Sequence, residues 1–227
     1  MDDFRHRFAD PDLASRYAEG PPLFMPGYAD VQVMTAVLLA ERCGLRADIL
    51  VLGAGGGQEL RRFADLQPGW RFTGVDPAPA MLDAARVAMG EATQRVELIE
   101  GVIDDAPRGP FCGACCLLTL HFLPAEERLR TLRAVRERLK RGAAFVAAHG
   151  SFPQAPAERA LWLDRYVAFA LARGADPALV SQARAGMDGD VHLLDPDTDE
   201  ALLREAGFSD VTAFYSGFTW RGWVAYA

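Results

Sequence analysis

Short apolar runs alternate with amphipathic segments along most of the chain. The runs are rich in β-branched and aromatic residues and end near Gly or Pro, whereas the segments between them repeat their apolar positions at helical spacing. This alternation is typical of a parallel sheet with helices on both faces. It predicts seven strands, at residues 48–53, 71–75, 96–100, 114–120, 143–148, 211–215 and 220–226.

The segments between the strands predict helices at residues 57–66, 79–90, 124–141 and 198–206. Two further helical patterns, at 156–174 and 177–185, interrupt the alternation after the fifth strand. We expect this helical insertion (about 155–186) to form a lid or wall over a site. Ser216-Gly217 separates the last two strands and predicts an antiparallel hairpin. The predicted fold is therefore α/β, a Rossmann-like doubly wound sheet of seven mostly parallel strands with a C-terminal hairpin.

A glycine-rich turn follows the first strand, and an acid ends the second. Residues 49–57 read Ile-Leu-Val-Leu-Gly-Ala-Gly-Gly-Gly, and Asp76 follows Val75. Glycine lets the backbone approach a ligand at the mouth of a parallel sheet. An acid at the tip of the next strand can accept two hydrogen bonds from a ribose diol. The pattern predicts a nucleoside site, and the structural alternative is a tight turn with no ligand.

The residues after the turn decide which nucleoside ligand fits. Gln58-Glu59-Leu60 lacks the Lys and Ser/Thr that end a phosphate-binding P-loop. Glu59 in the first helical turn would repel the pyrophosphate of a dinucleotide, although the helix dipole favours an acid there. The pattern favours a ligand with a ribose and no phosphate, such as S-adenosylmethionine (SAM). NAD is the least favoured ligand.

Composition narrows the function classes. At 227 residues and 50% hydrophobic, the chain can bury one sizeable core. A net charge of -7 argues against a general nucleic-acid binder. No run of about 18 apolar residues and no signal-peptide core is evident, so we expect a cytoplasmic protein with no membrane partner.

The four cysteines are the remaining candidate metal ligands. Cys112 and Cys115 have the spacing of a CxxC motif, but no second pair accompanies them. Cys115 and Cys116 also open the apolar run of the fourth strand. We therefore expect buried thiols and no metal site.

From Asp48 onward the chain resembles the class I SAM-dependent methyltransferases. Five segments resemble motifs of that family in order and spacing. The first is the glycine-rich turn, the second carries the acid, and the others follow the third and fourth strands and precede the C-terminal hairpin. They lie at residues 52–57, 74–82, 100–105, 119–123 and 204–208.

Within that family the chain is similar to the carboxy-SAM synthases that serve tRNA uridine modification. It shares their Pro26-Gly27-Tyr28 segment and their Thr-Leu-x-Phe-Leu pattern at 119–123. Those enzymes usually carry Asp after the glycine of the adenine loop and Asn inside the fourth strand, where this chain has Val102 and Leu117. These two differences argue against carboxy-SAM synthesis, and they do not argue against SAM binding.

The resemblance implies a SAM-binding domain at 48–227 and an N-terminal helical segment at 1–47 that covers the cofactor. The implied cofactor contacts are Tyr28, Gly53, Ala54, Gly55, Asp76, Pro77, Met81, Val102, Ile103, Asp104 and Thr119. The resemblance implies that the glycine loop faces the methionyl part of SAM, that Asp76 accepts hydrogen bonds from the ribose hydroxyls, and that Thr119 lies near the sulfonium. Tyr28 covers the cofactor or, alternatively, only packs in the core.

The adenine ring would lie between Pro77 and Met81 on one side and Val102 and Ile103 on the other. Val102 cannot accept a hydrogen bond from the exocyclic amine through its side chain, so Asp104 or Asp105 is the candidate acceptor. The alternative is that both acids are solvated turn residues.

Methyl transfer requires mainly that the methyl donor and the acceptor are aligned, and it requires a general base only when the acceptor loses a proton. His121, after the fourth strand, is the candidate catalytic base; the alternative is a histidine that packs under the insertion. His149 and His192 are weaker candidates. Trp162, Tyr166 and Phe169 share one helical face and line an acceptor pocket or the core.

The expected function is SAM-dependent methyl transfer to a small-molecule acceptor, with S-adenosylhomocysteine (SAH) as product. Two alternatives remain: carboxy-SAM synthesis, which needs a basic residue such as Arg221 near the cofactor, and SAM binding without catalysis. A homodimer is left open.

Overall fold

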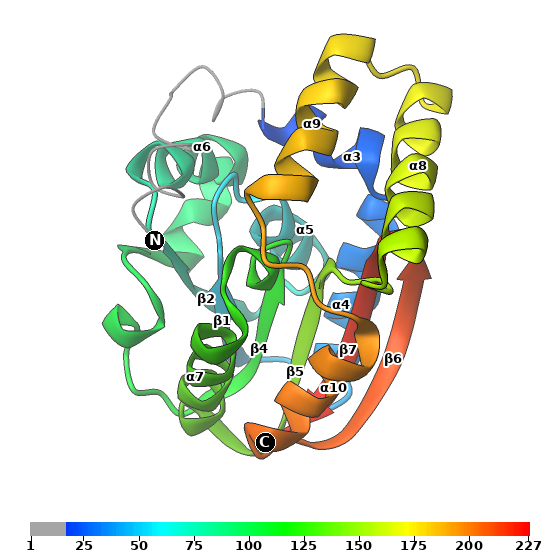
Figure 1. The fold of residues 1–227 in the computed structure, drawn as a ribbon. Helices are drawn as coiled ribbons and strands as arrows, with labels where there is room; N and C mark the ends of the chain where they lie inside the picture. Colours follow the sequence, from blue (N-terminus) through cyan, green and yellow to red (C-terminus); the bar gives the residue numbers. More distant parts are fainter. Residues whose placement is uncertain (1–16) are drawn as a thin grey trace.

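The computed structural model describes residues 17–227, and its centre is a seven-stranded sheet in the order β3-β2-β1-β4-β5-β7-β6 (Figure 1). The strands are β1 (Ala47–Leu52), β2 (Trp70–Asp76), β3 (Val96–Glu100), β4 (Phe111–Leu117), β5 (Leu139–Gly150), β6 (Ser209–Gly217) and β7 (Trp220–Tyr226). Strands β1 to β5 are parallel, and β7 runs antiparallel to both β5 and β6. The predicted fold is confirmed, including the C-terminal hairpin.

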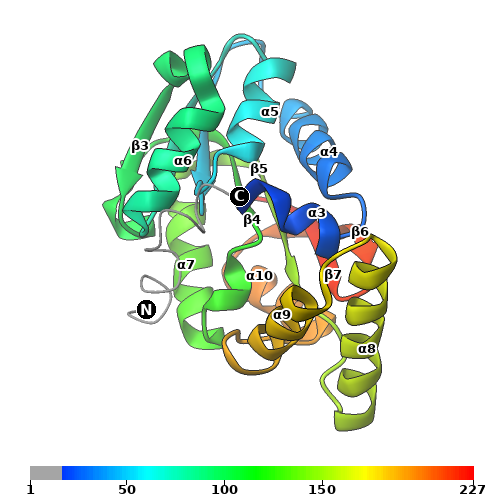
Figure 2. The same ribbon diagram turned by 90° about the horizontal axis from the view of Figure 1, so that it is seen from above.

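Helices cover both faces of the sheet (Figures 1 and 2). One face carries α4 (Tyr28–Ala40), α5 (Gln58–Leu66) and α6 (Pro79–Met89), and the other carries α7 (Ala125–Glu137) and α10 (Pro196–Glu205). The short helices are η1 (Tyr17–Glu19), α3 (Pro21–Phe24), η2 (Gly90–Arg95), η3 (Ile103–Asp105) and η4 (Leu120–Phe122). The insertion consists of α8 (Pro156–Ala172) and α9 (Pro177–Gly189).

The continuous apolar strands divide their side chains between two cores. Ile49 and Val51 of β1 pack into the core under α4 and α5, whereas Leu50 and Leu52 pack into the core under α7 and α10. Successive side chains of a strand point to opposite faces, so a strand buried on both sides needs apolar residues at every position. Cys115 and Cys116 of β4 follow the same division, which confirms the prediction of buried thiols.

Several boundaries differ from the predictions by two to four residues, and two of them have a clear physical reason. The fourth strand ends at Leu117, and not at residue 120, because Leu118 adopts a left-handed backbone conformation with φ 56°. The predicted helix at 124–141 ends at Glu137, and β5 begins at Leu139. After the buried Leu139, the β5 residues Lys140, Arg141 and Gly142 are exposed, so their pattern resembles that of a helix surface.

The insertion and the N-terminal segment pack together above the carboxyl ends of the strands. The rings of Phe24 and Tyr166 stack with centroids 5.2 Å apart, and Tyr166 also contacts Trp220 of the hairpin. The hairpin fastens the N-terminal segment: Trp220 Nε1–H donates to the Phe24 carbonyl (2.9 Å), and the Tyr215 hydroxyl donates to the Pro26 carbonyl (2.6 Å). The insertion extends to Gly189, slightly beyond the predicted 186. Residues 1–16 of the predicted N-terminal segment lie outside the described residues.

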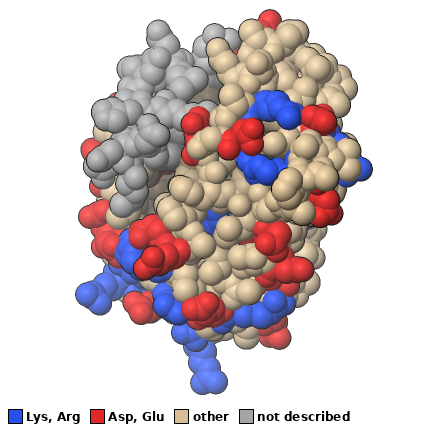
Figure 3. Space-filling model, in the orientation of Figure 1, with Lys and Arg blue, Asp and Glu red and all other residues tan. Residues whose placement is uncertain are grey.

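Within residues 17–227, no single helix is long and apolar enough to cross a membrane. The pair Tyr17–Phe24 and Tyr28–Ala40 has sufficient length and apolar character only when taken together, and it is bent by 93°. Charged side chains of both signs are interspersed on the face seen in Figure 3.

Candidate functional site

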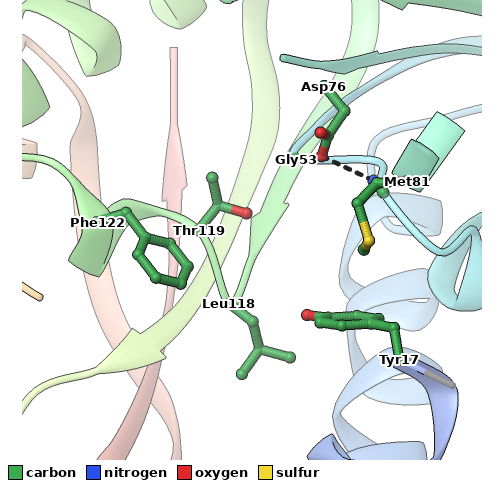
Figure 4. Close-up of a pocket in the computed structure, with 8 residues that line it drawn as sticks. Tyr17, Gly53, Asp76, Met81, Leu118, Thr119 and Phe122 are labelled. Atoms are coloured by element: carbon green, nitrogen blue, oxygen red, sulfur yellow. Dashed lines mark hydrogen bonds between the residues drawn. The ribbon is translucent and has the colours of Figure 1, made fainter. Parts of the chain in front are cut away.

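A cavity opens at the carboxyl ends of β1, β2 and β4. Its lining residues come from the N-terminal segment, the glycine loop, the end of β2, the start of α6 and the segment after β4 (Figure 4). They are Tyr17, Gly53, Gly55, Asp76, Met81, Leu118, Thr119 and Phe122. The strand order reverses between β1 and β4, and ligands of open α/β sheets bind at this switch point.

The glycine loop brings β1 against the end of β4. Gly53 has φ 77°, and a Cβ at this position would collide with the Thr119 hydroxyl. A Cβ on Gly55 would lie 2.7 Å from Asp76 Oδ2. The Gly56 N–H donates to the Met81 carbonyl (3.0 Å), which ties the loop to α6. The loop therefore requires glycine because neighbouring groups leave no room for a side chain.

The Asp76 carboxylate is held in a fixed orientation at the cavity wall. Oδ2 accepts from the Gly55 N–H (3.0 Å) and Oδ1 accepts from the Ala78 N–H (2.9 Å). Burial raises the pKa of Asp76 to about 6, although both hydrogen bonds favour the charged form. Each oxygen keeps capacity for a further hydrogen bond. The group thus fits the role of acceptor for a ribose diol.

The segment after β4 forms the opposite wall of the cavity. Leu118, with φ 56°, is a non-glycine residue in a sparsely populated conformation. Such residues concentrate at functional sites, where the surrounding structure holds them. The turn directs Thr119 and Phe122 toward Asp76 and Met81 (Figure 4). The Thr119 hydroxyl donates to the Leu117 carbonyl (3.0 Å).

Five of the predicted cofactor contacts line this one cavity: Gly53, Gly55, Asp76, Met81 and Thr119. Ala54 is buried beside them, and its N–H donates to the Val75 carbonyl (3.1 Å). The cavity lining does not include Tyr28, Pro77, Val102, Ile103 or Asp104. The cofactor contacts assigned to these residues stay predictions.

Both acids of the predicted adenine loop have partners in the protein. Asp105 Oδ2 accepts from the Val102 N–H (2.8 Å) and closes the turn. Asp104 forms an exposed ion pair with Arg130 (2.7 Å). Ile103 is buried in the core under α7. Both acids are exposed, as in the alternative that they are solvated turn residues, and an adenine contact through either of them stays a prediction.

Tyr17 is the aromatic residue that the sequence analysis missed. Its ring lies against the glycine loop, since a Cβ on Gly56 would be 2.8 Å from Tyr17 Cδ1. Burial raises the pKa of the Tyr17 phenol, and the charges of Glu59 and Asp76 add to the shift. Tyr28, half-buried, packs against the core at the start of α4. The shared Pro-Gly-Tyr segment directed attention to Tyr28, and no comparable pattern marks Tyr17.

His121 lies next to the cavity and does not line it. It is 4% exposed, and its Nδ1 accepts from the Gly150 N–H at 3.4 Å. Its ring contacts those of Phe122 and Trp220, with centroids 4.4 and 5.8 Å away. This placement agrees with the packing alternative, and the catalytic role of His121 stays a prediction.

His149 belongs to a buried charge cluster on the other side of His121. Arg128 pairs with Asp199 and also donates to the His192 carbonyl (2.6 Å), while His149 Nε2 lies 3.2 Å from Asp199 Oδ1. Burial opposes the charge of Asp199, but His149, Arg128 and Ser151 outweigh it and hold its pKa at about 2. The cluster joins α7, α10 and β5. Among residues 17–227 no group of three or more His, Cys, Asp or Glu side chains could hold a metal ion.

Residues 49–142, which contain the glycine loop, Asp76 and Thr119, match a methyltransferase domain family. The chain is 28% identical over 209 residues to a carboxy-S-adenosyl-L-methionine synthase of Chromohalobacter salexigens, covering 89% of this chain and 76% of the relative. It is 29% identical over 213 residues to the synthase of Pseudomonas aeruginosa, covering 88% and 85%.

Solved structures share the fold. The SAM-dependent methyltransferase SibL has a TM-score of 0.61 at 22% identity, covering 88% of this chain and 56% of its own. PigF, solved with SAH, has a TM-score of 0.67 at 17% identity, covering 99% and 62%. Human N-acetylserotonin methyltransferase, solved with SAM, has a TM-score of 0.64 at 15% identity, covering 98% and 58%. The chain thus spans less than two thirds of these structural neighbours.

These findings agree with the resemblance read from the motifs and with SAM as the expected cofactor. Residues 49–142 match a methyltransferase domain family, and the chain shares the Rossmann-like fold of solved SAM-dependent methyltransferases.

Proposed function

We propose that this protein binds SAM in the cavity at the β1–β4 switch point and transfers its methyl group to a small molecule. The observation that carries the proposal is the Asp76 carboxylate, oriented by two backbone N–H groups at the cavity wall. The methyltransferase domain match over residues 49–142 supports the same function.

The bound cofactor supplies an activated methyl group on a sulfonium, so the protein contributes mainly alignment and exclusion of water. Asp76 would accept the ribose hydroxyls. The backbone of Gly53 and Gly55 would bind beside the methionyl part. Tyr17 and Leu118 would shield the site from solvent. Thr119 is the polar side chain opposite Asp76, where it can orient the reacting groups.

The acceptor would bind on the side of the cavity next to the insertion. Tyr166 and Trp220 are buried above the carboxyl end of β5, and Trp162 lies half-buried beside them. None of these three aromatic side chains is among the described residues that line the cavity, and the small size of the acceptor is part of the proposal. A homodimer is compatible with the exposed Phe218 and Leu161 but has no contact to support it.

Thermal unfolding with SAM, SAH and NAD tests the proposal. A ligand at ~100-fold excess over its dissociation constant stabilises the native state by about 2.7 kcal/mol. We expect SAM and SAH to raise the midpoint, NAD to leave it unchanged, and Asp76→Ala to abolish the shift. Asp83→Ala, an exposed acid on α6, is the control. Failure of both SAM and SAH to bind would refute the proposal.

Carboxy-SAM synthesis is the second candidate, because relatives with that name align with 88–89% of the chain. Its reaction needs a basic residue to bind a carboxylate. Among the described residues that line the cavity, none is basic. Arg221 lies at the start of β7, over the Trp162 ring (5.4 Å), and donates to the Phe218 and Trp220 carbonyls.

Mass spectrometry separates the two reactions. The protein would be incubated with SAM and small carboxylic acids in one arm and with candidate methyl acceptors in the other. A carboxylated form of SAM would establish the second candidate, whereas SAH with a methylated acceptor would establish the first. SAM binding with neither product would favour a non-catalytic SAM-binding protein.

A further inference from the structure

Within residues 17–227, a buried carboxyl group close to the cavity has no ion-pair partner. Glu59 is the second residue of α5, directly after the glycine loop, and it is 5% exposed. It forms no salt bridge with any residue in the described range 17–227. Burial of an ionised carboxylate is unfavourable unless a positive group compensates it. The location therefore needs an explanation.

The titratable groups around Glu59 come from four elements, and none of them compensates its charge. They are Tyr17 of η1, Tyr28 of α4, Asp76 of β2, and Cys115 and Cys116 of β4. All are acids or neutral groups at pH 7. Tyr17 and Asp76 also line the cavity, so Glu59 lies close to the cavity.

The position of Glu59 in the first turn of α5 indicates which charge a ligand at this site should carry. The N-terminus of a helix carries partial positive charge, which by itself favours an anionic ligand and repels a cation. A carboxylate in the first turn reverses this preference. The site beside the glycine loop is therefore suited to a positively charged group and unsuited to a phosphate.

We propose that Glu59 is the counter-charge for the amino group of the cofactor's methionyl part, an inference that rests on the proposed function. Asp76 would fix the ribose, which leaves the glycine loop and the first turn of α5 for the amino-acid end. Glu59 is then a residue that selects cofactors with a charged amino group over nucleosides that lack one.

Proton release is the signature of this role. Burial raises the pKa of Glu59 to about 8, and the charge of Asp76 adds to the effect. The free protein therefore holds a proton on Glu59 at neutral pH. An ammonium group beside the carboxyl favours its charged form, so binding would release the proton. The affinity for the cofactor should then rise as the pH approaches about 8 and fall at higher pH, where the amino group of the ligand itself loses its proton.

Isothermal calorimetry at pH values between 6 and 9, in buffers of different ionisation enthalpy, measures this release. The ligands are SAM, SAH and 5′-methylthioadenosine, which keeps the ribose and adenine but lacks the amino acid. Between pH 7 and about 8 we expect SAM and SAH to release a proton and methylthioadenosine to release none. Asp76 titrates near pH 6, and any proton release from its carboxyl should be the same for all three ligands, because all three carry the ribose.

Glu59→Gln keeps the shape of the side chain and removes its charge. We expect this variant to lose proton release above pH 7 and to bind SAM about tenfold more weakly at alkaline pH, as for the loss of one charge-assisted hydrogen bond. Its affinity for methylthioadenosine should stay unchanged. Glu126→Gln is the matched control, because Glu126 is an exposed acid in the first turn of α7.

The outcomes separate this inference from the proposed function. SAM binding without proton release in the wild type, or unchanged release in Glu59→Gln, would overturn the role of Glu59 alone. Equal release with methylthioadenosine would also overturn it. If none of the three ligands binds, the proposed function and the inference both fail. The comparison of SAM with methylthioadenosine uses only the wild-type protein, so it tests the role of Glu59 even if Glu59→Gln folds poorly.

Discussion

At the scale of single residues, the site depends on places where the backbone leaves no room for a side chain. Gly53 and Gly142 have nearly the same left-handed conformation, with φ 77° and 73°. A Cβ on Gly53 would collide with Thr119, whereas a Cβ on Gly142 would have no atom within 4 Å. The two glycines therefore separate the effect of backbone conformation from that of close approach.

Gly142→Ala should destabilise the protein by about 1–2 kcal/mol, the penalty for a left-handed alanine. Gly53→Ala should destabilise it more, because the collision with Thr119 adds to that penalty, and it should also abolish SAM binding. Urea unfolding gives the free energies, and calorimetry gives the binding. Equal losses of stability in the two variants would show that the contact between residue 53 and Thr119 does not contribute to the free energy of unfolding.

At the scale of elements, the buried cluster of Arg128, Asp199 and His149 joins two helices to β5. Removing one partner leaves the others buried and uncompensated, which costs more than the loss of a surface pair. The pKa of Asp199 is about 2 in the folded protein, below its ordinary value of 3.8. Its contribution to stability is therefore complete above about pH 4.

Asp199→Asn should lower the free energy of unfolding by about 3–5 kcal/mol at pH 7. Asp197→Asn, at an exposed position in the same first turn of α10, should change it little. As the pH falls from 4 toward 2, the wild type should lose its advantage over Asp199→Asn, since the wild-type carboxyl becomes protonated. Chemical unfolding at several pH values measures this; an advantage that persists at pH 2 would contradict the assignment.

At the scale of the whole molecule, the C-terminal hairpin holds the N-terminal segment that carries Tyr17. The Tyr215 hydroxyl and Trp220 Nε1–H reach carbonyls about 190 residues earlier in the chain. Tyr17 covers the cavity only while η1 and α3 stay in place. The affinity for SAM is therefore coupled to contacts distant from the cavity.

Tyr215→Phe removes one of these two hydrogen bonds and leaves the Pro26 carbonyl without its donor. We expect faster hydrogen exchange in α3 and at the start of α4, and SAM binding weakened by about three- to tenfold, in line with ~1 kcal/mol for one hydrogen bond. Tyr226→Phe, at the far end of the same hairpin, is the control. Unchanged exchange in α3 would show that the hairpin does not hold the segment.

Most of the architecture could be predicted from local pattern. The alternation of apolar runs and helical segments gave the strand count and the hairpin, and the glycine loop with Asp76 gave the position of the site. The start of β5 could not be predicted, because Lys140, Arg141 and Gly142 are exposed and interrupt the apolar pattern of the strand. The end of β4 depends on the left-handed Leu118, a conformation that local propensity disfavours.

The sequence by itself determined the strands of the sheet, the order of the elements along the chain and the position of Asp76 at the end of the second strand, because these depend on periodicity and on short motifs. The tertiary structure alone decided which aromatic covers the cavity, that Glu59 is buried, and that His121 faces Gly150 and Trp220. Each of these depends on contacts between segments far apart in the chain. Burial and pairing of a side chain are properties of its neighbours, and no local pattern carries that information.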